Sequence, residues 1–244
     1  MNEQEIEHVL RIGWGLAEPG ARGPRAELSP AQIVDTAVTI ADEQGISAVT
    51  MARVAERLGF SAMSLYRHLG SKEELLALMI DRAGRFPEMP ESNGDWRSGL
   101  SDMARRAIVL YRQHPWLLDV PTSMVNILLP GGVRTTEAVL AILRDVPLAQ
   151  DEKLAILLAF TVTLRAYAAL ARDITSQAKV FTPVVGEILG EVITADRFPN
   201  LAPMLDGGLY GEPESAEEMD EDLGYALERL FDGIAARIAQ SDAR

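Results

Sequence analysis

The side chains that most often catalyse reactions are few in this chain and stand apart from one another. The sequence contains no cysteine, which excludes a thiolate nucleophile, a disulfide and a cysteine metal site. The three histidines, His8, His68 and His114, have no serine or aspartate at a spacing that indicates a catalytic group. No glycine-rich phosphate loop and no carboxylate pair on an apolar face is evident. The sequence therefore predicts no enzyme, no cofactor and no metal site; metal binding through His114 is a weaker alternative, because no matching His or Glu set accompanies it.

Residues 50–68 indicate a different chemistry, the binding of nucleic acid. Two short helical patterns flank Gly59, and Thr50 and Ser61 are their N-caps. A tight turn between two short helices makes a helix-turn-helix, whose second helix enters the major groove of DNA. Glycine permits the positive φ that the turn needs, and we expect Phe60 to fix the turn to the core. The alternative is an ordinary corner of a helical bundle, because this spacing alone is a weak signal.

Neighbouring elements complete the predicted module. One helix is expected from Ser29 to Gly45, and the helix after Gly59 is expected to end at Gly70. A fourth helix should begin at Ser71, where Glu74 would complete a capping box. Apolar residues recur at helical intervals along these helices: Ile33, Ala37, Ile40, Ala41; Met51, Val54, Ala55, Leu58; Ala62, Leu65, Leu69; Leu75, Leu76, Leu78, Met79.

The whole pattern predicts an all-α protein. It comprises an N-terminal extension or arm at 1–28, a three-helix helix-turn-helix domain at 29–85, and a larger helical domain at 86–244. Residues 1–16 read as a short amphipathic helix, and 197–214 as a Pro/Gly-rich loop. The further helices are predicted at about 95–113, 122–129, 131–145, 149–178, 181–195 and 215–240.

The formal net charge of −13 opposes nucleic-acid binding by the chain as a whole. The acidity lies away from the predicted module, because residues 22–85 hold eight basic and eight acidic side chains. Residues 86–244 hold fourteen basic and twenty-four acidic side chains. The objection is therefore weakened.

The composition favours a cytoplasmic protein. The N-terminus is acidic where a signal peptide would be basic. The longest apolar-rich run, 154–170, is interrupted by Thr161, Thr163 and Arg165, so we expect no membrane helix. A reducing cytoplasm is the simplest setting for a chain without cysteine.

The stretch from Leu28 to Met79 resembles the DNA-binding domain of the tetracycline-repressor (TetR) family. The run Arg112-Gln113-His114-Pro115-Trp116 also looks like the subgroup closest to the tetracycline repressor. The segments that carry the resemblance are Ile33-Val34-Asp35-Thr36-Ala37, Ala41-Asp42-Glu43-Gln44-Gly45, Val49-Thr50-Met51, Val54-Ala55-Glu56-Arg57-Leu58-Gly59, Ser64-Leu65-Tyr66-Arg67-His68-Leu69 and Ser71-Lys72-Glu73-Glu74-Leu75-Leu76.

This resemblance implies DNA contacts for individual residues. Thr50 and Lys72 match phosphate contacts, Arg53 matches a basic position on the first helix of the motif, and Tyr66 and His68 match backbone contacts. Hydroxyls, lysines and helix N-termini are typical phosphate partners. The predicted DNA-binding set is Arg22, Arg25, Thr50, Arg53, Ser61, Ala62, Met63, Ser64, Tyr66, Arg67, His68 and Lys72.

The base-reading face implied by the resemblance, Ala62, Met63 and Ser64, is sparse. Ser64 can hydrogen-bond to a base, whereas Ala62 and Met63 can only pack on a thymine methyl. Ala52 stands where many relatives carry a basic residue. Selectivity must then draw on DNA shape or on the arm, whose two arginines would contact the minor groove or the phosphates. A solvated tail is an equal alternative for the arm.

A repressor of this kind needs a second copy of the chain and a small-molecule signal. The resemblance therefore implies that residues 86–244 form a ligand-binding and dimerisation domain. The helices near 149–178 and 215–240 are predicted to form a homodimer, as in the family's four-helix bundle; a role in the core of one chain is the alternative. We expect an apolar or aromatic effector, with core packing as the alternative for each residue of its pocket. The candidate ligand-binding residues are Met103, Arg106, Ala107, Leu110, Ile127, Leu128, Phe160, Thr163, Leu164 and Tyr167.

The predicted function is that of a ligand-responsive transcriptional repressor that releases a palindromic operator when the effector binds. The alternative is a helical protein-interaction module that has lost specific DNA binding. Ala52, the sparse recognition face and the net charge favour that alternative, whereas Tyr66, His68 and Lys72 oppose it.

Overall fold

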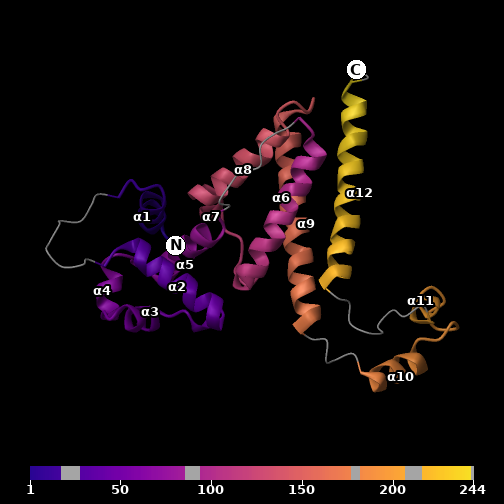
Figure 1. The fold of residues 1–244 in the computed structure, drawn as a ribbon, viewed down its shortest axis with the longest axis horizontal. Coiled ribbons are helices and arrows are strands. Elements are labelled where there is room, and N and C mark those ends of the chain that lie inside the picture. Colours follow the sequence, from indigo (N-terminus) through magenta and orange to yellow (C-terminus); the bar gives the residue numbers. More distant parts are fainter. Residues whose placement is uncertain (18–27, 86–93, 177–181, 207–215, 243–244) are drawn as a thin grey trace. The chain divides into compact units, whose positions relative to one another are not determined.

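A computed structural model describes residues 1–17, 28–85, 94–176, 182–206 and 216–242, and every regular element within them is a helix (Figure 1). The all-α prediction is confirmed. The α-helices are α1 Glu3–Gly13, α2 Pro30–Gln44, α3 Met51–Leu58, α4 Ala62–Tyr66, α5 Lys72–Ala83, α6 Trp96–Gln113, α7 Met124–Leu128, α8 Pro130–Ile142, α9 Gln150–Ser176, α10 Pro183–Val192, α11 Ala202–Asp206 and α12 Ala216–Asp242, and the 3₁₀ helices are η1 Ile46–Ala48 and η2 Pro115–Leu118.

The helices gather into two compact units. The first comprises Met1–Leu158 with Ser241–Arg244, and the second comprises Ala159–Gln240. Helices α6, α7 and α8 therefore cluster with the DNA-binding helices, while α10, α11 and most of α9 and α12 form the second unit. The boundary expected between residues 85 and 86 separates the DNA-binding domain from the C-terminal domain. Residues 86–93 lie outside the described residues, so this boundary stays a prediction.

Helix α2 begins where the sequence predicts. The Gln32 N–H donates to Ser29 Oγ at 3.2 Å, and the Ser29 N–H donates to the Gln32 side chain at 2.9 Å, which completes a capping box. Ile33, Ala37 and Ile40 are fully buried. The apolar face predicted for this helix is therefore the one that packs into the core.

The capping box expected at the start of α5 forms only by half. The Glu74 N–H donates to Ser71 Oγ at 3.2 Å, but the Glu74 carboxylate turns away from the helix start. Its Oε2 accepts from the Gly70 N–H at 2.9 Å and from His8 Nδ1 at 2.8 Å. Only 3% of the Glu74 side chain is exposed, so these bonds replace the hydration lost on burial.

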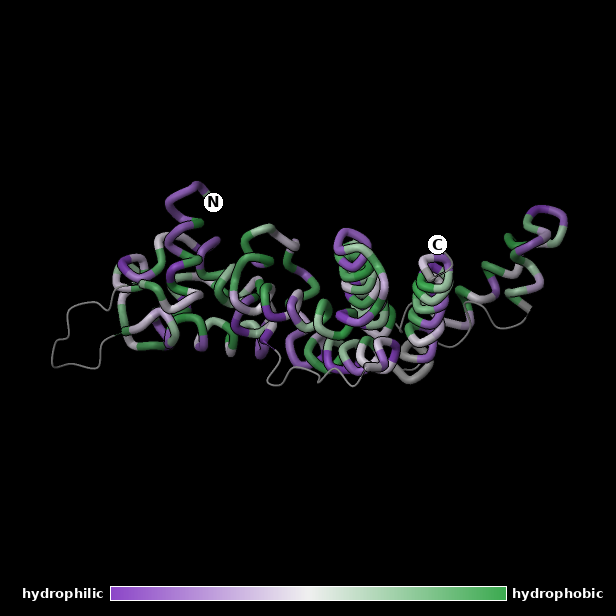
Figure 2. The backbone as a smooth tube through the Cα atoms, turned by 90° about the horizontal axis from the view of Figure 1, so that it is seen from above, coloured by the Kyte–Doolittle hydropathy of each residue, from purple (hydrophilic) through white to green (hydrophobic). Residues whose placement is uncertain are grey.

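Helix α1 confirms the short amphipathic helix expected within residues 1–16, and it is packed against its neighbours. Val9 is fully buried, and α1 lies against α5 and α7. Trp14 Nε1 donates to the Leu128 carbonyl at 3.0 Å, which joins the end of α1 to the end of α7. Figure 2 shows the hydrophilic start of this helix at the N-terminus. Arg22 and Arg25 of the predicted arm lie outside the described residues.

The third helix ends earlier than expected. It was expected to reach Gly70, but α4 stops at Tyr66. The N–H groups of His68 and Leu69 both donate to the Leu65 carbonyl at 2.9 Å, so a turn closes the helix. Leu69 is fully buried although it follows the end of α4. The apolar pattern used to predict this helix therefore extends beyond it.

Two contacts fix the ends of α6 within the first unit. Asp42 of α2 accepts at Oδ1 from Trp116 Nε1 and from His114 Nδ1, both at 2.7 Å. Near the other end, a Cβ on Gly99 would stand 2.8 Å from Cγ2 of Ile142 in α8, closer than carbon atoms approach. Glycine here permits the close approach of α6 to α8.

Helix α9 leaves an apolar row exposed. Leu154, Leu158, Val162 and Leu170 are 49–65% exposed and lie at intervals of four or eight residues. By length and composition α9 is also long enough and apolar enough to cross a membrane, which taken alone is weak evidence for a span. An exposed apolar row on a single chain is also the feature that a second copy would cover.

Helix α12 has an apolar stripe that packs within the single chain. Leu223, Leu227 and Ile234 of this stripe are only 5–7% exposed, which agrees with the core role expected as the alternative for part of this helix. They therefore belong to the core, while Tyr225 on the same helix is 66% exposed. The turns of the helix that ends at the C-terminus in Figure 2 include both green and purple residues, as those of an amphipathic helix do. Helix α11, in addition, lies in a segment predicted to be a loop.

Candidate nucleic-acid interface

Helices α3 and α4 form the predicted helix-turn-helix. Gly59 adopts a left-handed conformation with φ of 76°, and the Phe60 N–H donates across the turn to the Ala55 carbonyl at 2.9 Å. This pattern ends a helix and turns the chain sharply. Val54, Ala55 and Leu65 are at most 1% exposed, so the inner faces of both helices are anchored in the core.

Phe60 does not fix the turn to the core, contrary to expectation. Its side chain is 42% exposed. The turn is instead held by backbone hydrogen bonds around Gly59, which do not depend on the side chain of the following residue. An apolar residue at this position therefore adds to the outer surface of the motif.

The outer surface of α4 presents the predicted base-reading residues. Met63 is 68% exposed, and Ala62 and Ser64 are half-buried. Ser61 caps the helix by accepting from the Ser64 N–H at 3.3 Å, and the hydroxyls of these two serines lie 2.9 Å apart. The Ser64 hydroxyl therefore already has one partner, and Met63 is the most exposed of the three predicted base-reading side chains.

Flanking side chains surround that surface with donors. Tyr66 is 46% exposed, and Arg67 and Lys72 are also exposed. Lys72 stands at the first position of α5, where the helix N-terminus adds its own positive potential. His68 is half-buried in the turn between them. Together these groups match the donors that proteins direct at phosphates.

The start of α3 carries two further residues of the predicted DNA-binding set, Thr50 and Arg53. Thr50 Oγ1 accepts from the Arg53 N–H at 3.1 Å, so the hydroxyl proton can be donated elsewhere. The Arg53 guanidinium donates to the Gln44 side chain and remains exposed. To contact a phosphate, the Arg53 guanidinium must either keep its bond to the Gln44 side chain or break it.

Arg57, the other arginine of α3, forms an ion pair with an acidic side chain. Its two terminal nitrogens donate to the Glu43 carboxylate at 2.6 and 2.9 Å. These hydrogen bonds lower the pKa of Glu43 and raise the pKa of Arg57. The pair is exposed, and it neutralises one positive charge beside the motif.

Six of the candidate ligand-binding residues lie in the first unit, namely Met103, Arg106, Ala107, Leu110, Ile127 and Leu128. Met103 and Ala107 on α6 are buried, and the candidate between them, Arg106, is exposed. Leu110 packs against the core of the DNA-binding helices, which favours its alternative role as a core residue. Ile127 and Leu128 on α7 are 44% and 46% exposed.

The other four candidates lie on α9 in the second unit. Phe160 and Leu164 are buried, and Thr163 and Tyr167 are half-buried. The Thr163 hydroxyl donates to the Ala159 carbonyl of its own helix at 2.8 Å. A common effector pocket for all ten residues stays a prediction.

Sequence reasoning missed three carboxylates, the buried Asp81 and Glu74 and the more exposed Asp42, that tie the DNA-binding helices to their neighbours. Asp81 of α5 accepts at Oδ1 from the Gly131 N–H at 2.6 Å, in the first turn of α8, and at Oδ2 from Arg85 at 2.5 Å. Asp42 and Glu74 make the comparable contacts described above. Only the spacing of four between Asp81 and Arg85 was a signal in the sequence.

The arrangement defines a class of protein. A capped helix-turn-helix with an exposed second helix, flanked by hydroxyl and basic donors, is a module that binds double-stranded DNA.

Known proteins agree with this assignment. Residues 33–79 match the family model of bacterial regulatory proteins of the tetR family, and residues 86–238 match the tetracyclin repressor-like C-terminal domain. The chain therefore belongs to the TetR family of transcriptional regulators. The HTH-type transcriptional repressor DrrR1 of Streptomyces coeruleorubidus is 34% identical over 97% of this chain and 88% of its own length.

Solved structures show the same architecture. ActR of Streptomyces coelicolor in complex with actinorhodin is 26% identical, with a TM-score of 0.72 over 87% of this chain and 97% of that chain. ActR in complex with (S)-DNPA is 27% identical, with a TM-score of 0.70 over 87% of this chain and 99% of that chain.

Family membership decides between the alternatives that the sequence left open. The relatives are named as transcriptional repressors and regulators, so this chain is a DNA-binding regulator and not an enzyme. A helical interaction module without DNA binding is not favoured.

Proposed function

We propose that this protein is a cytoplasmic homodimeric repressor that binds a palindromic operator and releases it when a small apolar or aromatic molecule binds the C-terminal helices. The observation that carries the proposal is the exposed surface of α4, with Met63 outward and the donors of Thr50 and Lys72 at its two edges. DrrR1 is a repressor, and ActR binds actinorhodin, which supports both halves of the proposal.

Two copies are required for tight and specific binding. A single helix-turn-helix buries too little surface for a nanomolar complex, so such modules act in pairs that read half-sites about 34–36 Å apart. The exposed row of Leu154, Leu158 and Val162 on α9 offers the second copy an apolar surface. Helix α12 would contribute through its exposed side, where Tyr225 lies.

Release of the operator requires the C-terminal helices to act on the DNA-binding helices. Asp81 joins α5 to the first turn of α8, and Asp42 joins α2 to the residues that follow α6. An effector that shifts α6 or α8 would pull on both junctions and change the spacing of the two recognition helices. A coupling free energy of about 1–3 kcal/mol suffices for such a switch.

Fluorescence anisotropy with labelled DNA from the region upstream of the gene tests operator binding. Binding should be nanomolar, salt-sensitive and stronger than to a scrambled duplex. Lys72→Ala should weaken binding to both duplexes and reduce the slope of log affinity against log salt by about 2 for the dimer, about 1 for each copy. Arg105→Ala removes the same charge from the exposed side of α6 and should change neither quantity. Equal effects of the two substitutions, or no binding at low salt, would contradict the proposal.

A further inference from the structure

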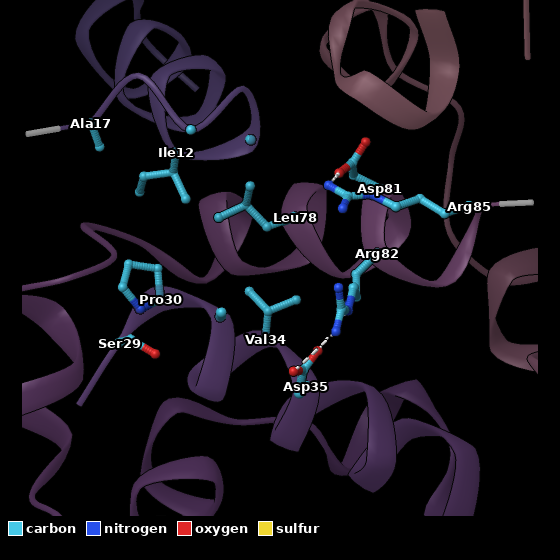
Figure 3. A pocket seen from close by; sticks show the side chains of 13 residues that line it. Ile12, Ala17, Ser29, Pro30, Val34, Asp35, Leu78, Asp81, Arg82 and Arg85 are labelled. Atoms are coloured by element: carbon cyan, nitrogen blue, oxygen red, sulfur yellow. Dashed lines mark hydrogen bonds and ion pairs between the residues drawn. The ribbon is translucent and has the colours of Figure 1, made fainter. Parts of the chain in front are cut away.

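A groove lies within the first unit, beside the helix-turn-helix and separate from its DNA-binding face. It has a volume of about 360 Å³, within the range of about 300–1,000 Å³ that small-molecule sites occupy. Its walls come from α1, from the start of α2 and from the second half of α5, as Figure 3 shows. None of the predicted DNA-binding residues within the described ranges lines it.

The groove has an apolar floor. Ile12, Val34 and Leu78 point toward the same space from three different helices in Figure 3, and Pro30 lies beside them. Val34 and Leu78 are at most 5% exposed, so the floor belongs to the packed core and is held in place without a ligand. A preformed apolar surface of this kind favours the apolar part of a small molecule.

Small residues keep the groove open. Gly15, Ala17 and Ala31 line its edge, where longer side chains would take up its space. A Cβ placed on Gly15 would meet no atom within 4 Å. The open volume therefore results from the residues chosen along α1 and α2.

One edge of the groove is polar and rich in donors. Arg82 uses Nε and Nη2 to donate to the two carboxylate oxygens of Asp35, at 2.7 and 3.2 Å. A guanidinium carries N–H groups on three nitrogens, so Nη1 keeps its donors for another acceptor. The opposite carboxylate, Asp81, already accepts from Gly131 and Arg85. The edge can thus offer hydrogen bonds to an acidic oxygen more readily than it can accept them.

Helix α1 supplies one wall of this groove. The match to the DNA-binding family model covers residues 33–79, and α1 and Pro30 precede it. Without α1, one wall of the groove would be missing. From the groove's size, its apolar floor and its donor edge, we propose that it is a second small-molecule site, one that takes an apolar molecule bearing a single acidic group such as a carboxylate or sulfonate.

Methyl NMR with 1-anilinonaphthalene-8-sulfonate as the probe tests this site on the full-length protein. The methyl resonances of Ile12, Val34 and Leu78 should shift in a saturable way as the probe is added. Ala31→Trp fills the groove from an exposed position and should abolish these shifts. Thr39→Trp places the same ring on an exposed position of α2 outside the groove and should leave the shifts unchanged. Shifts that are absent, or that survive Ala31→Trp, would overturn the site.

The acidic group is tested with a neutral relative of the probe, N-phenyl-1-naphthylamine. Arg82→Met should raise the dissociation constant of the sulfonate at this site about threefold to fivefold, as expected for a half-exposed ion pair. It should leave the dissociation constant of the neutral compound unchanged. An equal change for both compounds would refute the assignment of Arg82 as the partner of the acid.

Discussion

Replacement of Asp81 tests whether α5 is firmly joined to α8. The Asp81 side chain is 2% exposed, and it accepts from the Gly131 N–H at 2.6 Å and from Arg85 at 2.5 Å. In Asp81→Ala the Gly131 N–H would lose its acceptor, and Arg85 would lose its carboxylate. A hydrogen bond to a charged group contributes about 1.5–3 kcal/mol, and a negative charge at a helix N-terminus about 0.3–1 kcal/mol. We therefore expect the free energy of unfolding to fall by about 2–4 kcal/mol.

Urea unfolding followed by circular dichroism measures this loss, with all variants at one protein concentration because the dimer links stability to concentration. Asp35→Ala is the matched control, because it breaks another Asp–Arg pair to α5 whose side chains are 49% and 50% exposed. An exposed pair contributes about 1 kcal/mol at most. Asp81→Asn keeps an acceptor for Gly131 but no charge, and should fall between the two. A loss in Asp81→Ala no larger than in Asp35→Ala would refute the reasoning.

Three further results are expected. Gly59→Ala should lower the free energy of unfolding by about 1–2 kcal/mol in the same urea assay because φ is 76°, whereas Gly186→Ala, in α10 with open space around its Cα, should not destabilise. Arg57→Gln should return the pKa of Glu43 toward its ordinary value of 4.5 in an NMR titration; the pair stabilises the fold above the unfolded carboxyl pKa, and that contribution is lost as the pH falls through the lower folded pKa. An unchanged Glu43 pKa would exclude Arg57 as the cause. Leu158→Glu should convert the dimer to monomer in sedimentation, since it places a charge on a side chain that is 65% exposed in one chain.

The helix-turn-helix was predictable because its signals are local. Ser29, Thr50, Ser61 and Ser71 each accept a backbone N–H three residues ahead at the start of a helix, as their positions predict. Gly59 takes the left-handed conformation that the turn needs. N-caps and turn glycines depend on a few neighbouring residues, so the sequence alone reveals them.

The junctions between helices could not be predicted in the same way. His8 and Glu74 are 66 positions apart, His114 and Asp42 are 72 apart, and Gly131 and Asp81 are 50 apart. Which carboxylate meets which donor depends on how the helices pack, and a single sequence carries no record of that packing. Glu74 illustrates the point, because local rules assigned it to a capping box while a distant histidine took its carboxylate.

The C-terminal helices show a different limit. A stripe of apolar residues at helical spacing states that one face is buried, but it does not state by what. On α12 the stripe through Leu223 and Ile234 is covered within one chain, whereas on α9 the row through Leu154 and Leu158 is left exposed. The two patterns look alike in the sequence, so core and dimer surface separate only when one chain is seen folded by itself. The same ambiguity applies to the effector pocket, where Leu110 fits the apolar pattern of a pocket wall and yet packs against the DNA-binding core. Leu110 packs against a buried cluster in which Trp116 and Leu117 lie together with residues of α2 and α5, so burial alone accounts for its apolar side chain.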